Sequence, residues 1–160
     1  MESIAHLFNQ YGYIILTVSL ILELLALPLP GQTIMTYCGY IIQEQNMNLA
    51  LGILMACIGG ITGITISYFL GRALGRPFFE KYGHYIHLKQ STLDKISKYF
   101  DKYGIFMLFI SYFIPGVRHF TGYFSGIIRL PLKKFMISAY LGALVWTGTF
   151  ICFGRFLGNL

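Results

Sequence analysis

Three stretches of the 160-residue sequence are apolar over a length that can cross a lipid bilayer: Tyr11–Leu29, Leu49–Leu70 and Phe135–Phe153. A membrane-spanning helix needs about 20 predominantly apolar residues. Only 11% of the residues are charged, whereas an average soluble domain carries roughly 25%. So few charges cannot cover a water-soluble globule of this size. The sequence therefore predicts an all-α integral membrane protein.

Two further apolar stretches are short or interrupted. Thr33–Ile42 is too short to span a bilayer, and Ile105–Ile128 contains Pro115, Gly116 and Arg118 near its centre. Broken backbone and charge at membrane depth occur where the chain is buried in protein or lines a cavity. The second stretch is therefore predicted to be a re-entrant hairpin or a broken helix.

A polar region, Gly71–Tyr103, joins the apolar halves, and residues 77–102 are predicted to be a cytoplasmic connector that contains an amphipathic helix. Ser91 resembles a helix cap, with Asp94 three positions later. Apolar residues then recur at steps of three and four, with lysines on the remaining faces: Leu93, Ile96, Phe100 and Tyr103, against Lys95, Lys98 and Lys102. This pattern favours a helix in the membrane surface, with its lysines toward anionic headgroups. A solvated connector is the alternative.

The sequence contains an internal repeat, with one half at residues 11–76 and the other at residues 103–159 of a single membrane domain, 1–160. Gly59 and Gly142 each precede a Gly-Arg-x-Leu-Gly motif by the same interval, and each half begins with Tyr-Gly and later has Pro-Gly. Transporter folds contain such repeats, with the substrate site at the repeat interface. Chance similarity between glycine-rich membrane segments is the alternative.

The distribution of Lys and Arg favours an inverted arrangement of the two halves. Cytoplasmic loops carry an excess of these residues, and inversion places the basic connector and Arg129, Lys133 and Lys134 on the same side. The predicted fold has two facing re-entrant hairpins held by two long spanning helices. The predicted hairpin tips are Pro28, Pro30 and Gly31 in the first hairpin, about 11–42, and Pro115 and Gly116 in the second, about 104–128. In the alternative, Tyr11–Leu29 spans the bilayer completely.

Two ionisable residues inside apolar segments are the leading candidates for a functional site. Glu23 lies within the first apolar stretch and Arg118 follows the second Pro-Gly. Intramembrane charges are costly and mark functional sites by default, and the planar arginine fork suits a phosphate ester. We expect both side chains to face one cavity that Gln32, Tyr112 and His119 help to shape. The alternatives are a purely structural ion pair and an arginine that extends to the membrane interface.

The motifs resemble those of the DedA family, relatives of the SNARE-associated, VTT-domain membrane proteins, over nearly the whole chain. The resemblance rests on Glu23, Pro28-Leu29-Pro30-Gly31, Gly59 to Tyr68, Gly71-Arg72, Phe113-Ile114-Pro115-Gly116-Val117-Arg118, Gly126, Phe135, Gly142 and Trp146. It implies facing re-entrant hairpins and movement of lipid across the bilayer. Family members are associated with recycling of undecaprenyl phosphate or with the distribution of phospholipids such as phosphatidylethanolamine, and some are coupled to the proton gradient.

The sequence departs from the family pattern at three positions. Gln32 stands where the family usually has an acid, Tyr112 where it usually has an arginine, and Ile64 where an aspartate is frequent. Only Glu23 and Arg118 therefore carry over as charged site residues. With one cation and one acid fewer, a zwitterionic phospholipid becomes at least as plausible a substrate as a polyprenyl monophosphate.

The predicted function is transbilayer movement of a phosphate-bearing lipid in a bacterial plasma membrane by a multi-pass protein. Arg118 would bind the phosphate, and Glu23 would balance its charge or contact an amine. The predicted partners are membrane lipids, with protons as candidate coupling ions; no nucleic acid, cofactor or metal is expected. The sequence has no phosphate-binding glycine loop and no cluster of acids, which disfavours an enzyme. The alternatives are an enzyme acting on a lipid headgroup and a membrane assembly subunit without transport.

Overall fold

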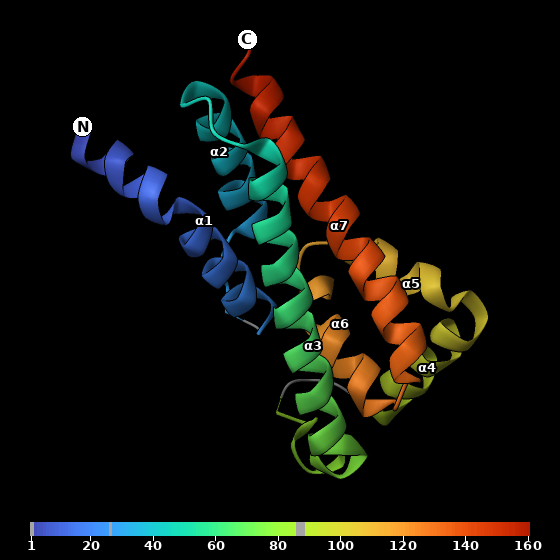
Figure 1. The fold of residues 1–160 in the computed structure, drawn as a ribbon. Coiled ribbons are helices and arrows are strands. Elements are labelled where there is room, and N and C mark those ends of the chain that lie inside the picture. Colours follow the sequence, from blue (N-terminus) through green and yellow to red (C-terminus); the bar gives the residue numbers. More distant parts are fainter. Residues whose placement is uncertain (1, 26, 86–88) are drawn as a thin grey trace. The chain divides into compact units, whose positions relative to one another are not determined.

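A computed structural model describes residues 2–25, 27–85 and 89–160, and all regular structure in these ranges is helical. The side chains described are those of residues 11–25, 27–85, 89–104 and 106–160. The helices are α1 (Glu2–Leu24), α2 (Gly31–Glu44), α3 (Leu49–Tyr82), α4 (Gln90–Tyr103), α5 (Ile105–Ser111), α6 (Val117–Ile127) and α7 (Leu132–Leu157) (Figure 1). The predicted all-α class is confirmed.

Among the residues that the structure describes, two helices are long and apolar enough to cross a membrane. They are α3, with 34 residues, and α7, with 26, and they contain the predicted spans Leu49–Leu70 and Phe135–Phe153. α3 extends beyond its predicted end, with a kink at Gly75, whose φ of 62° lies in the left-handed region that glycine adopts readily. The first part of the predicted connector, 77–102, is therefore a continuation of α3, and residues 86–88 of it lie outside the described residues.

The apolar stretch Tyr11–Leu29 is not helical to its end, because α1 ends at Leu24. Pro28 and Pro30 follow within six residues, and a proline both lacks a backbone donor and disfavours helical geometry in the residue before it. Leu27 and Leu29 precede these prolines. Helical structure resumes at Gly31, after Pro30. The chain therefore forms a helical hairpin here, and α1 and α2 pack against each other.

The contacts divide the chain into two compact units, and both long helices pass through both of them. Unit 1 comprises Met1–Gly63 and Ala143–Leu160, and unit 2 comprises Ile64–Gly142. Each unit thus holds one helical hairpin, the N-terminal part of one long helix and the C-terminal part of the other.

Glycines allow helices to cross at close range in unit 1. Gly39 of α2 lies against the backbone carbonyl of Ile151 in α7, and Gly154 of α7 lies against the carbonyl of Thr36 in α2. A Cβ atom at either glycine would overlap the opposing backbone. Packing therefore explains why the Gly-Arg-x-Leu-Gly motif begins with glycine at Gly154.

The first Gly-Arg-x-Leu-Gly motif has the same role in unit 2. Gly71 of α3 lies against the carbonyl of Tyr123 in α6, and Gly126 of α6 lies against the carbonyl of Tyr68 in α3. Tyr68 also donates a hydrogen bond of 2.6 Å from its hydroxyl to the carbonyl of Leu130. Its ring stacks on that of Phe135 with the centroids 4.3 Å apart. These contacts fix the turn between α6 and α7.

The predicted amphipathic helix in the connector is confirmed as α4. Leu93 and Phe100 are buried, and the lysines of this helix are exposed. Its start differs from the prediction, because Lys89 is the N-cap and no side chain caps the helix. The backbone N–H of Thr92 donates to the carbonyl of Lys89, so Ser91 lies inside the first turn and cannot cap it.

Candidate functional site

The turn between α1 and α2 holds the residues predicted as the first hairpin tip. Pro28 and Pro30 are exposed, and Gly31 is buried as the first residue of α2. Pro30 is the N-cap, and no side chain supplies a capping hydrogen bond. The carbonyl of Pro30 accepts the N–H of Ile34 at 3.0 Å, which closes the first turn.

Glu23 is completely buried, with 0% of its surface exposed, in the last turn of α1. Its carboxylate occupies the space beside Gly31, where a Cβ atom would overlap it. The first N–H groups of a helix have no partner within the helix, and the helix dipole makes this end positive. The N-terminus of α2 therefore supplies a favourable environment for the Glu23 carboxylate, and glycine at position 31 lets it approach.

The turn between α5 and α6 holds the second predicted tip. Pro115 and Gly116 are exposed, and Gly116 precedes α6 with a φ of 84°. This left-handed conformation is strained for a residue with a Cβ atom. It allows the chain to reverse between Ser111, where α5 ends, and Val117, where α6 begins.

Arg118 is 5% exposed and is the second residue of α6. Its guanidinium is therefore a buried positive charge on a helix whose N-terminus is itself positive. Helix N-termini bind phosphate and carboxylate groups for this reason. Arginine adds a planar set of donors that matches the oxygens of a phosphate. The first turn of α6 thus combines a buried arginine with the positive end of a helix.

The remaining predicted site residues divide between the two units. Gln32 is half-buried in the first turn of α2 and borders a cavity of about 480 Å³ in unit 1. His119 is half-buried beside Arg118, and Tyr112 is completely buried with its ring against Gly142 of α7. The structure therefore places Gln32 near Gly31 in one unit and places Tyr112, Arg118 and His119 in the other. Glu23 belongs to unit 1 and Arg118 to unit 2. That both side chains face one cavity therefore stays a prediction.

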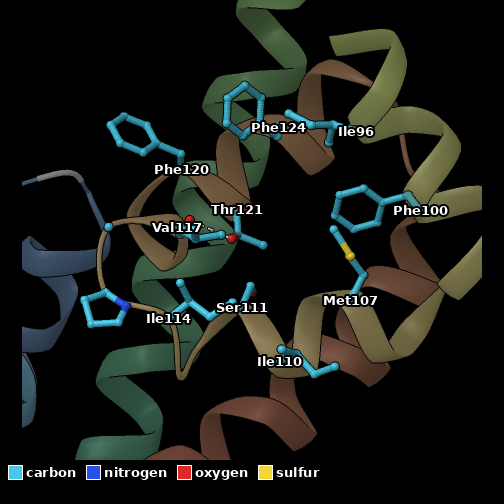
Figure 2. Close-up of a pocket in the computed structure, with 12 residues that line it drawn as sticks. Ile96, Phe100, Met107, Ile110, Ser111, Ile114, Val117, Phe120, Thr121 and Phe124 are labelled. Atoms are coloured by element: carbon cyan, nitrogen blue, oxygen red, sulfur yellow. Dashed lines mark hydrogen bonds between the residues drawn. The ribbon is translucent and has the colours of Figure 1, made fainter. Parts of the chain in front are cut away.

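A second cavity, which the sequence analysis missed, lies in unit 2 between α4, α5 and α6 (Figure 2). Its volume is about 540 Å³, and its wall is almost entirely apolar. The sequence does contain an indication of this cavity, because four residues that line it recur at helical spacing along one face of α6. These are Val117, Phe120, Thr121 and Phe124.

The described residues, 2–25, 27–85 and 89–160, contain no group of three or more His, Cys, Asp or Glu side chains that could hold a metal ion. Glu23 is carried by the last turn of α1 and lies beside the first residue of α2, whereas Arg118 is carried by the first turn of α6.

Residues 29–156 match the VTT domain family. The chain is 42% identical over 158 residues to the uncharacterized membrane protein YbfM of Bacillus subtilis, which covers 99% of this chain and 98% of YbfM. It is 33% identical over 151 residues to undecaprenyl phosphate transporter A of the same organism, over 94% of this chain and 74% of that protein. An alkaline phosphatase-like protein of Lactococcus lactis is 31% identical over 163 residues, covering 99% and 76% of the two chains. No solved structure matches.

Proposed function

Because the chain belongs to the VTT-domain family of membrane proteins, the DedA family that its motifs resemble, we propose that it moves a phosphate-bearing lipid between the leaflets of a bacterial plasma membrane. The observation that carries this proposal is the buried Arg118 in the first turn of α6. A buried cation at the positive end of a helix favours an anion at that place. In a membrane, the phosphate of a lipid headgroup is the abundant anion that such a site meets.

Glu23 has a different proposed role. Its carboxylate lies at the N-terminus of α2, where the helix dipole favours negative charge. We assign it to the amine of a zwitterionic headgroup or to uptake of a proton as the headgroup leaves. Gln32, Tyr112 and His119 would then shape the polar path through their own units.

The fold supports this proposal through the recurrence of one packing motif. In each unit, the second hairpin helix crosses the C-terminal part of a long helix through a pair of glycines: Gly39 with Gly154, and Gly126 with Gly71. We propose that the two hairpins are copies of one re-entrant unit in an inverted repeat. Transporters built on such repeats bind their substrate at the repeat interface.

The substrate class follows from the number of charges. Arg118 is the one lysine or arginine in the sequence from Ile105 to Ile127, so this hairpin offers a single arginine to a phosphate. One relative is named for undecaprenyl phosphate transport. For this chain we propose a lipid with one phosphate, either a phospholipid such as phosphatidylethanolamine or undecaprenyl phosphate.

Reconstitution in liposomes tests the proposal. The protein is inserted into vesicles that contain a headgroup-labelled phosphatidylethanolamine, and an impermeant quencher measures transfer between leaflets. Hydrogen bonds to charged groups contribute about 1.5–3 kcal/mol, so Arg118→Gln should lower the initial rate about tenfold or more. Arg118→Lys should fall between the parent and Arg118→Gln, because lysine keeps the charge and loses the fork.

Arg129→Gln is the matched control, since Arg129 is an exposed arginine at the end of the same hairpin. Equal rates for the parent and Arg118→Gln would refute the proposed phosphate contact. Release of inorganic phosphate or a new covalent product from the labelled lipid would instead favour the enzyme that the name of the Lactococcus relative suggests.

A further inference from the structure

A third cavity lies between α1 and α2, within unit 1. The two helices pack against each other and lie side by side in Figure 1. The volume of the cavity is about 310 Å³, which is at the lower end of the roughly 300–1,000 Å³ of small-molecule sites. Its wall is largely apolar, and the residues that the argument uses are Ile15, Leu16 and Ser19 of α1 and Thr33 and Ile34 of α2.

The wall of this cavity offers no charge to a ligand. Among the residues that the structure describes, none of those lining it is Asp, Glu, Lys, Arg or His. The sequence from 1 to 63, which contains both helices, has no lysine or arginine. The two helices therefore supply no cation to a phosphate group, and the cavity favours the uncharged part of a ligand.

Two hydroxyl groups in the wall are available to such a ligand. Among the described side chains, those of Ser19 and Thr33 make no hydrogen bond. The hydroxyls of Thr17 in α1 and Thr36 in α2, by contrast, each donate to the carbonyl four residues earlier at 2.8 Å. A hydroxyl without a partner in apolar surroundings costs free energy. The wall therefore favours a ligand that brings hydrogen-bond acceptors to Ser19 and Thr33.

We propose that this cavity binds an acyl chain of a glycerolipid, with the Ser19 and Thr33 hydroxyls donating to its ester carbonyls. In a bilayer, the ester carbonyl is the uncharged acceptor that adjoins a hydrocarbon chain. A transmembrane helix of a partner fits this wall less well, because its backbone carbonyls are already bonded within that helix. The site recognises the ester linkage and not the headgroup. The inference goes beyond the proposed transport, because it requires neither Glu23 nor Arg118.

Photocrosslinking of the full chain in vesicles tests this site. The vesicles consist of phosphatidylcholine with ether-linked chains, which lack the carbonyl. They also contain a very small fraction of ester-linked phosphatidylcholine that carries a diazirine in one acyl chain. We expect saturable crosslinks to concentrate in the peptides that contain Ile15, Leu16 and Ile34.

Exchange of the surrounding lipid separates the linkage from the headgroup. One net hydrogen bond corresponds to about fivefold in affinity. Replacing the ether-linked lipid by unlabelled ester-linked phosphatidylcholine should therefore lower the crosslink yield about 25-fold. Ester-linked phosphatidylglycerol should lower it equally, because no charged side chain among the described residues lines the cavity. An unchanged yield in ester-linked lipid, or a preference for one headgroup, would overturn the proposal in the parent protein alone.

Two variants remove the hydroxyls with little change of shape. Ser19→Ala and Thr33→Val should each reduce the preference for ester-linked lipid about fivefold, and the double variant should abolish it. Thr36→Val is the matched control, because its hydroxyl is bonded within α2 and Thr36 does not line the cavity. It should keep the preference of the parent. A double variant that still prefers the ester would show that the hydroxyls do not contact the carbonyls.

A bulky substitution tests the position of the chain. Ile34→Trp should abolish the saturable crosslinks, whereas Ile41→Trp should keep them, because Ile41 is also half-buried on α2 and does not line the cavity. Loss in both variants or in neither, crosslinks spread evenly over all apolar helices, or a crosslinked dimer would refute the site. Arg118→Gln should lower transport and leave the crosslinks unchanged, so failure of the proposed function is distinguishable from failure of this inference.

Discussion

Each hairpin has one buried charge near the start of its second helix, and the two charges are opposite in sign. In unit 1 a buried carboxylate, that of Glu23, lies beside the first residue of α2. In unit 2 a buried guanidinium, that of Arg118, is carried by the first turn of α6. The helix dipole favours the first charge and opposes the second.

This difference indicates a division of roles. The hairpin of unit 1 contains both the positive helix end and an anion that balances it. The hairpin of unit 2 adds a cation to a positive helix end, which together favour an anion. The two hairpins thus differ in which charge is buried near the start of the second helix: a carboxylate in unit 1 and a guanidinium in unit 2.

The largest expected effect comes from the glycine crossings that hold each hairpin against its long helix. Gly39→Ala in unit 1 and Gly126→Ala in unit 2 each force a Cβ atom onto a backbone carbonyl, and we expect a loss of about 3 kcal/mol or more in each case. Gly148→Ala is the control, because a Cβ atom there meets open space and alanine is about 0.5–1 kcal/mol better than glycine within a helix. The measurement is the apparent melting temperature of the purified protein in detergent. Sensitivity in only one unit would show that the two crossings are not equivalent.

Headgroup selectivity gives the next largest effect and tests the division of roles directly. Arg118→Gln should reduce transport of phosphatidylethanolamine and phosphatidylglycerol alike, by about tenfold or more, because both lipids carry the phosphate. Glu23→Gln should reduce transport of phosphatidylethanolamine more strongly, since only that headgroup carries an amine. Parallel liposome assays with the two labelled lipids measure the ratio. If Glu23→Gln slows both lipids equally, the carboxylate does not contact the amine.

Much of this arrangement could be predicted from the sequence, because it depends on local chemistry. Glu23 and Arg118 are conspicuous as charges within apolar stretches, and both are buried. The prolines and glycines predicted as hairpin tips also lie in or next to the turns between α1 and α2 and between α5 and α6. The apolar stretch Tyr11–Leu29 extends five residues beyond the end of α1 at Leu24, because apolar composition continues through the turn and helical backbone geometry does not.

Other features depend on how helices meet and could not be predicted. The proximity of Glu23 to Gly31 requires the hairpin to close, and nothing in either residue's sequence neighbours shows it. The cavity of unit 2 requires α4, α5 and α6 together. Periodicity on α6 alone indicates an apolar face and does not distinguish a packed face from one that lines a cavity.

Stability of the two charge-neutralising variants gives a smaller effect. Glu23→Gln removes a carboxylate from the N-terminus of α2, and we expect a loss of about 0.5–2 kcal/mol. Arg118→Gln removes a cation from a helix end where the dipole opposes it, so its loss should be smaller than that of Glu23→Gln. Melting temperatures of both variants in the same detergent make the comparison. A larger loss for Arg118→Gln would mean that the guanidinium is chiefly a structural group.

The smallest expected effect on stability comes from removing single side-chain hydroxyl groups that hydrogen-bond to another element of the same unit. In unit 2 the Tyr68 hydroxyl donates to Leu130 at 2.6 Å and accepts from Arg72 at 3.0 Å. In unit 1 the Thr17 hydroxyl lies 3.0 Å from the Met55 carbonyl of α3 and also donates to Tyr13 in its own helix. Tyr68→Phe should cost about 1 kcal/mol, because Phe keeps the ring stack on Phe135 and loses the polar contacts.

Thr17→Val should cost less than Tyr68→Phe, since the Thr17 hydroxyl has an acceptor within α1 as well as one across the helix pair. The difference is measurable as a small downward shift in melting temperature for Tyr68→Phe and a smaller one for Thr17→Val. Transport should be preserved in both variants, because neither hydroxyl lies at the first turn of α2 or α6. A Tyr68→Phe variant that melts normally but fails to transport would place Tyr68 in the headgroup path, and would mean that unit 2 handles its ligand with more than Arg118.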